Sequence, residues 1–271
     1  MKLIDLSRHS LKAIGRSIGL DVQMVDGHLH CTPLDPDDPR YATDFIVPSW
    51  KMVDACRADD FDFFQPFIDT GKLTVEQMHH AAQRYHLGKT RSGRPMFWMI
   101  DDMLTPLDAH ITSDTWLSQL LKKREPLLEF WCPTHCLFGL HLLSDTGITE
   151  NPDNGLHNSW SGNKPVCVVE SEQSAVVLSE LIPESIWMAC NSVPLPDISL
   201  FAPLQGHKVT IYPHTDSSLS NYLFFDELAA SAVRHYHLQL TASSFLEDNA
   251  TEEQKERNID LVDFLFEHTE K

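Results

Sequence analysis

The chain has 271 residues, of which 42% are hydrophobic, and this is enough for one large domain or two modest ones with a real core. Its 21 Lys and Arg stand against 39 Asp and Glu, a formal charge of −18, so the molecule as a whole repels phosphate polymers. Binding of nucleic acid would therefore need a local basic patch, a divalent metal or a partner protein.

The apolar segments are all shorter than a membrane span, and the first residues lack the continuous apolar core of a signal peptide. We therefore expect a cytoplasmic protein that makes no membrane contact. The cysteines are scattered, which favours reduced core residues over a disulfide framework. They are Cys31, Cys56, Cys132, Cys136, Cys167 and Cys190.

Residues 1–60 predict a small α+β segment to which the sequence assigns no role. An amphipathic helix is expected over residues 4–18, and residues 21–34 alternate around Asp26-Gly27 as a β-hairpin does.

Two groups of His and Cys have spacings that zinc could use, but neither has the second half-site of a complete zinc centre, so zinc is not favoured. The groups are His28, His30 and Cys31, and Cys132, His135, Cys136 and His141.

Residues 61–145 predict a helical hairpin followed by a small antiparallel meander. Thr74 and Gln77 have the spacing of a capping box at the start of the second helix, and a strand is expected over residues 96–100. The first turn of the meander is locally basic. A nucleic-acid backbone could use this cluster, although a solvated loop explains it more simply; its members are Lys89, Arg91 and Arg94.

Residues 144–163 are rich in Asn, Gly, Ser and Asp, which is typical of a linker or long surface loop. We place a boundary there, before a third region over residues 160–271.

The third region begins with a strand–helix–strand unit. A buried strand over residues 166–169 stops at Glu170, and Ser171 can then cap a helix whose first turn holds Glu172. A second strand follows over residues 186–190. This pattern predicts a right-handed βαβ unit of a parallel sheet, with Glu170 at the carboxyl edge where open α/β sheets bind ligands.

Two more strands are expected after this unit. One covers residues 207–213 and leads to His214-Thr215-Asp216, and a helix over residues 223–233 leads to the other, over residues 236–240. A last helix has Asp260 and Asp263 at its head. The fold class is therefore α/β, a parallel sheet flanked by helices in the C-terminal half, with a smaller α+β N-terminal region.

Two parallel strands thus end in carboxylates, Glu170 and Asp216. If the strands are neighbours, these groups meet at one edge, where Mg²⁺ or Mn²⁺ could bind, and Asp260 and Asp263 could serve as outer ligands or as helix caps. The simpler alternative is that acidic residues collect at strand ends because loops are polar.

At these positions the chain resembles the Toprim domain of primases and topoisomerases. That domain has a glutamate after its first strand and an Asp-x-Asp pair after its third, which correspond here to Glu170 and to His214 with Asp216. More specifically, the chain is similar to a Toprim-like family of poorly characterised proteins carried on bacterial mobile elements. The similar segments, in the order of that family, are Tyr85–Gly88, Phe97–Asp101, Cys136–Leu143, Lys164–Val176, Trp187, Leu204–Pro213 and Asp260–Leu265.

The resemblance implies a Toprim fold and, in active relatives, metal-dependent nucleotidyl or phosphoryl transfer on nucleic acid. The chain departs from it in two ways. His214 stands where the first aspartate of the third-strand motif is expected, and no cysteine-rich zinc ribbon precedes Phe61. Histidine is a poor ligand for Mg²⁺ and a better one for softer metals.

Two hypotheses follow from these features. The first is a primase-related protein of DNA replication or mobile-element maintenance, with Glu170 as general acid or base and with Asp216, His214, Asp260 and Asp263 around a metal. The second is a non-catalytic module that uses the same sheet edge to bind nucleic acid or a protein. The acidic charge, the missing zinc ribbon and His214 favour the second.

Overall fold

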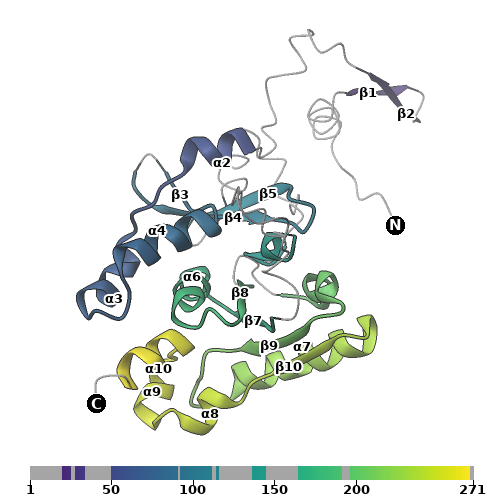
Figure 1. Cartoon of the computed structure of the whole chain (residues 1–271). Helices are drawn as coiled ribbons and strands as arrows, with labels where there is room; N and C mark the ends of the chain where they lie inside the picture. The colour runs from purple at the N-terminus through teal and green to yellow at the C-terminus, as the bar shows by residue number, and fades with distance from the viewer. Residues whose placement is uncertain are drawn as a thin grey trace, which may run out of the picture.

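A computed structural model of the chain describes residues 20–25, 28–33, 50–90, 92–111, 114–115, 136–144, 164–190 and 196–268 (Figure 1). The hairpin predicted near the N-terminus is confirmed, because β1 (Leu20–Val25) pairs antiparallel with β2 (His28–Pro33). The helix expected over residues 4–18 lies outside the described residues.

The rest of the N-terminal half combines short helices with a small antiparallel sheet of order β3-β4-β5-β6. The capping box at Thr74 and Gln77 is confirmed at the start of α4. The elements are α2 (Trp50–Cys56), η1 (Asp62–Phe64), α3 (Gln65–Asp69), α4 (Val75–Arg84), β3 (Gly88–Lys89), β4 (Pro95–Ile100), β5 (Pro106–Ile111), β6 (Asp114–Thr115) and η3 (Leu140–Leu143).

Strand β4 is buried on both faces and divides two hydrophobic clusters. Successive side chains of a strand point to opposite faces, so Trp98 and Ile100 belong to a small cluster with Val53 of α2. Phe97 and Met99 belong to the main core instead. The small sheet is therefore covered on both sides, by α2 and by the C-terminal half.

The C-terminal half contains a four-stranded parallel sheet of order β10-β9-β7-β8, flanked by helices, and this confirms the predicted fold class. The elements are β7 (Val166–Val169), α6 (Glu172–Leu181), β8 (Ile186–Ala189), η4 (Ile198–Leu204), β9 (Lys208–Tyr212), α7 (Ser220–Tyr236), β10 (Gln239–Ala242), α8 (Phe245–Asn249), α9 (Glu252–Glu256) and α10 (Leu261–His268).

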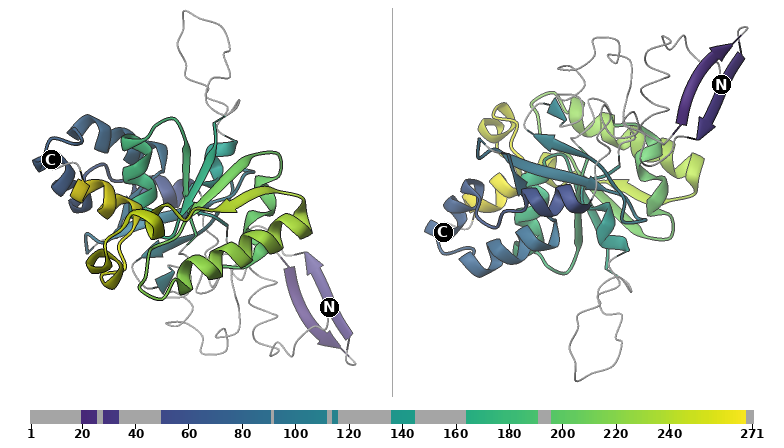
Figure 2. Two further views of the ribbon diagram at one scale, coloured as in Figure 1. Left: turned by 90° about the horizontal axis from the view of Figure 1, so that it is seen from below. Right: turned by 90° about the horizontal axis from the view of Figure 1, so that it is seen from above.

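The direction in which the sheet is built reverses at β7. The chain passes from β7 through α6 to β8 on one side, and then reaches β9 on the other side of β7. Helices α6 and α7 consequently lie on opposite faces of the sheet, with α7 in front when the molecule is seen from below (Figures 1 and 2). Open α/β sheets bind ligands at such a switch point, outside the carboxyl ends of the two strands.

One predicted strand was misplaced. The fourth strand, predicted over residues 236–240, begins three residues later, because α7 continues to Tyr236 and β10 covers Gln239–Ala242. The helix ends where His237 takes the left-handed conformation, with φ of 56°. Glycine is the usual residue there, so the sequence carries no ordinary signal for this helix end.

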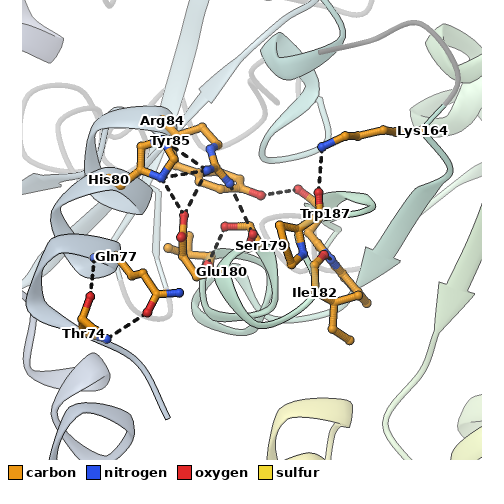
Figure 3. Close-up of polar contacts among 12 residues, drawn as sticks. Thr74, Gln77, His80, Arg84, Tyr85, Lys164, Ser179, Glu180, Ile182 and Trp187 are labelled. Atoms are coloured by element: carbon orange, nitrogen blue, oxygen red, sulfur yellow. Dashed lines mark hydrogen bonds and ion pairs between the residues drawn. The ribbon is translucent and has the colours of Figure 1, made fainter. Parts of the chain in front are cut away.

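Helix α4 is joined to α6 by buried polar contacts, which we call the α4–α6 joint (Figure 3). Arg84 Nη2 lies 3.0 Å from Glu180 Oε1 of α6, and the hydroxyl of Tyr85, the residue after α4, donates to the carbonyl of Trp187 in the strand after α6, β8, at 2.7 Å. The predicted boundary over residues 144–163 lies almost entirely outside the described residues. A single hydrophobic core nevertheless contains residues from both sides of it, from Phe61 to Phe264.

Candidate functional site at the switch point of the sheet

Glu170 and His214 come together because their strands are paired in register. Val169, the last residue of β7, is opposite Tyr212, the last residue of β9. The backbone N–H of His214 donates to Glu170 Oε1 at 2.8 Å, and the ring nitrogen Nδ1 lies 3.5 Å from the same oxygen. The sequence predicted that the carboxylates of Glu170 and Asp216 would meet at this edge; in the structure the group in contact with Glu170 is His214, and Asp216 is linked to Glu170 through Asn221.

Asp260 reaches the same edge from the head of α10. The Thr215 N–H donates to the Ile259 carbonyl at 3.0 Å, which ties the segment after β9 to the residue before Asp260. Asp260 Oδ2 lies 3.9 Å from His214 Nε2 and accepts a short hydrogen bond from the Ser174 hydroxyl. The imidazole of His214 thus lies between the carboxylates of two different elements.

Asn221, in the first turn of α7, joins the two strand-end carboxylates. Its side-chain amide donates to Glu170 Oε1 at 2.7 Å and to the His214 carbonyl at 3.0 Å, and its backbone N–H donates to Asp216 Oδ2 at 2.7 Å. The sequence did not predict a role for this residue, which carries no motif and lies five positions after Asp216. We call the connected side chains Glu170, Ser174, His214, Asn221 and Asp260 the strand-end network.

Asp216 accepts hydrogen bonds from residues just before and at the start of α7, and it meets the strand-end network at the backbone N–H of Asn221. Oδ1 accepts from the Ser218 N–H at 2.7 Å and from the Ser218 hydroxyl at 2.5 Å, and Oδ2 accepts from the Ser220 hydroxyl at 3.1 Å. Burial raises the pKa of Asp216, but these bonds and the N–H groups of Asn221 and Ser220 hold it well below its usual range. Asp216 therefore stabilises the helix start as a carboxylate, which the helix dipole also favours.

The charges of the network are mutually dependent. Burial lowers the pKa of His214, but the hydrogen bond to Asp260 and the charges of Glu170, Asp260 and Asp263 raise it more, so the net shift is upward. Burial raises the pKa of Asp260, and the hydrogen bonds from His214 and Ser174 lower it below its ordinary value. The arrangement therefore favours an imidazolium between carboxylates.

Asp263 lies at the edge of this network. Its backbone N–H donates to Asp260 Oδ1 at 2.8 Å, so Asp260 also caps α10. Burial and the neighbouring charge of Asp260 raise the pKa of Asp263. Of the two roles predicted for this pair, helix capping is the one that the hydrogen bonds display.

Beside His214 the surface opens into a pocket of about 480 Å³ between the start of α7 and the end of α9. Asp216, Asn221, Lys255 and Asn258 are among the residues that line it. The network is thus accessible to a ligand from one side, and the side chain of His214 is 30% exposed.

No group of three or more His, Cys, Asp or Glu is arranged to hold a metal in the part of the chain that the structure describes. Of the second zinc candidate, the described members are buried: burial raises the pKa of Cys136 to about 12 and lowers that of His141 to about 4. Cys132 and His135 lie outside the described residues, as do the side chains of His28 and Cys31. Mg²⁺ or Mn²⁺ at the strand-end network stays a prediction.

The basic cluster of the meander lies on the β3–β4 hairpin. Lys89 Nζ is 3.1 Å from Asp60 Oδ1 and 5.2 Å from the centroid of the Phe61 ring. Arg94 is exposed, and Arg91 lies outside the described residues. Lys89 therefore already has an acidic partner, whereas Arg94 is open to solvent.

None of the described helices combines the length and the apolar character needed to cross a membrane. A comparison with curated proteins finds no match. A family described as a domain of unknown function (DUF6371) matches residues 62–215, which is more than half of the chain and includes Glu170 and His214. On this match, the chain belongs to the DUF6371 family.

Proposed function

We propose that the chain is a Toprim-like, primase-related module of DNA replication or mobile-element maintenance that acts by binding, without a metal-dependent catalytic step. The observation that carries this proposal is the place of His214. Its two ring nitrogens lie 3.5 Å from Glu170 Oε1 and 3.9 Å from Asp260 Oδ2, in the position between carboxylates where a bound cation is expected.

An imidazolium at this place already balances part of the negative charge, so it reduces the attraction for a divalent cation. Magnesium also requires oxygen ligands in near-octahedral geometry. Asp216, the ligand that the resemblance implies, has both carboxylate oxygens engaged in hydrogen bonds from Ser218, Ser220 and Asn221. Arranged in this way, the acidic residues make a poor site for Mg²⁺ or Mn²⁺.

If the chain is a binding module, the ligand that the Toprim resemblance implies is nucleic acid. The acidic strand-end edge repels phosphate, so contacts would come from the β3–β4 hairpin, where Arg94 is exposed. Anisotropy of a labelled single-stranded oligonucleotide should then rise with protein concentration. Arg94→Ala should weaken this binding, and raising the salt concentration should weaken it further.

The metal-free nature of the site can be tested by thermal unfolding and calorimetric titration with MnCl₂ and MgCl₂. We expect no saturable binding to the wild-type protein. His214→Asp should remove the internal cation and add a carboxylate, so Mn²⁺ should then stabilise the variant against unfolding. Glu170→Gln in the His214→Asp background should abolish that stabilisation.

Metal binding by the wild-type protein would be the opposite outcome. Micromolar binding of Mn²⁺ or Mg²⁺ to the wild-type protein that disappears in Glu170→Gln would overturn the proposal. It would favour a metal-dependent nucleotidyl or phosphoryl transferase instead. His214→Asn, which removes the imidazole without adding a charge, serves as the control, and it should not gain Mn²⁺ binding.

A further inference from the structure

Helix α7 has one buried face and one face with unusual exposed side chains. Phe225, Ala229 and Ala232 are buried on the inner side. Leu219, Leu223 and Phe224, at the start of the helix, are 43%, 57% and 40% exposed. A single exposed leucine is ordinary, but three large apolar side chains within six positions form a patch, and patches of this kind mark interaction surfaces.

Acidic side chains border this patch. Residues three and four positions apart are neighbours on a helix, so Leu223 has Asp226 and Glu227 beside it on the solvent side. The charged side chains of α7 are Asp226 and Glu227 in its first half and Arg234 in its last turn. The first half of the helix therefore combines exposed apolar side chains with two negative charges.

We propose that Leu219, Leu223, Phe224, Asp226 and Glu227, together called the α7 face, dock a protein segment that carries apolar side chains flanked by Lys or Arg. Apolar contact would remove the exposed leucines and phenylalanine from water, and the basic groups would pair with the two acids. The apolar side chains and the two acids together specify the partner, because either feature alone would fit many other protein segments.

The same charges disfavour the other occupants. Nucleic acid would bring phosphates towards Asp226 and Glu227, and a second copy of the chain packed face to face would bring these acids against their own counterparts. The α7 face also lies outside the strand-end network. The inference therefore stands whether or not the site binds a metal.

The test uses the full-length protein and a fluorescein-labelled amphipathic peptide made of Leu and Lys. Fluorescence anisotropy should show saturable binding. The double change Leu223→Ser and Phe224→Ser should weaken this binding about tenfold or more, the loss expected when a buried Leu or Phe contact is removed. Asp226→Lys with Glu227→Lys should also weaken it, and this loss should diminish as salt is raised.

Matched controls lie elsewhere on the surface. Met103 is 80% exposed on the β4–β5 turn, and Glu76 is exposed in the first turn of α4. Met103→Ser and Glu76→Lys should leave peptide binding unchanged, and circular dichroism should show that all variants fold, since the altered side chains are exposed.

Several results would overturn the proposal. One is that the wild-type protein does not bind the peptide. Another is that the control variants lose as much peptide binding as the α7 variants, which would indicate attraction by net charge alone. A change from dimer to monomer on Leu223→Ser would assign the α7 face to a second copy of the chain. Loss of oligonucleotide binding in the α7 variants with peptide binding intact would assign the face to nucleic acid.

Discussion

Two polar clusters hold helices against the parallel sheet, and they differ in how their charges are balanced. In the α4–α6 joint, Arg84 faces Glu180 and also donates to the Ser179 carbonyl at 3.4 Å (Figure 3). In the strand-end network, the single imidazole of His214 faces the carboxylates of Glu170 and Asp260. The joint is close to neutral, whereas the network keeps an excess of negative charge beside an open pocket.

This difference in charge balance distinguishes a purely structural contact, the α4–α6 joint, from a candidate binding site, the strand-end network. A closed and balanced pair is what a structural contact between helices requires, because any unpaired charge there would be buried. An unbalanced cluster at the switch point of a parallel sheet costs stability and is accessible to a ligand. We therefore expect the joint to respond to mutation as a structural contact and the strand-end network to respond as a binding site.

The largest effect is expected at the joint. The side chains of Arg84 and Glu180 are only 14% and 7% exposed, so Arg84→Ala should leave a buried carboxylate whose remaining partner at this oxygen is the His80 imidazole, 3.3 Å away. We expect a loss of about 3–5 kcal/mol in the free energy of unfolding, measured in urea by tryptophan fluorescence.

The Arg257–Glu267 pair is the matched control, since its side chains are 51% and 32% exposed. Arg257→Ala should cost far less than Arg84→Ala, because solvent screens this ion pair. Equal losses in the two variants would show that the joint contributes no more than a surface ion pair.

A smaller loss is expected at the network. Asn221→Ala removes the amide that holds Glu170 and the His214 carbonyl, and we expect it to reduce the free energy of unfolding by about 1–3 kcal/mol. The exposed Asn249, whose amide donates to the Phe245 carbonyl at 2.7 Å, provides the control. Asn249→Ala should cost about 0.5 kcal/mol or less, and a larger cost there than at Asn221 would contradict a positioning role for Asn221.

The smallest changes in the free energy of unfolding near neutral pH are expected for two histidines. Their contributions to stability should change with pH in opposite directions. The pKa of His141, beside the joint, is lowered from 6.5 to about 4 by burial, so its neutral form is the stable one. Its contribution to stability should be full above pH 6.5 and should be lost as pH falls towards about 4. The pKa of His214 is raised above 6.5, so its contribution should be full below pH 6.5 and lost as pH rises through the raised value.

Urea unfolding of His141→Gln and His214→Gln across this pH range checks both signs. Relative to the wild-type protein, the cost of His141→Gln should shrink as pH falls, and the cost of His214→Gln should shrink as pH rises. Slopes of the same sign in the two variants would show that the two histidines do not occupy opposite electrostatic environments.

Much of the fold could be predicted because its signals are local. The alternation around Asp26-Gly27, the capping box at Thr74 and Gln77, and the apolar run that stops at Glu170 each depend on neighbouring residues only, and each leads to the expected element. The end of α7 could not be predicted, since His237 ends the helix without the usual glycine.

The sequence by itself determined that acidic residues and His214 follow parallel strands, and therefore that they approach one sheet edge. Only the tertiary structure decided their roles. The pairing of Val169 with Tyr212 and the approach of α10 place His214 between Glu170 and Asp260, whereas Asp216 is held by the first turn of α7 and bridged to Glu170 by Asn221. Charge balance between groups more than 40 residues apart in the chain depends on distances that spacing along the sequence does not contain.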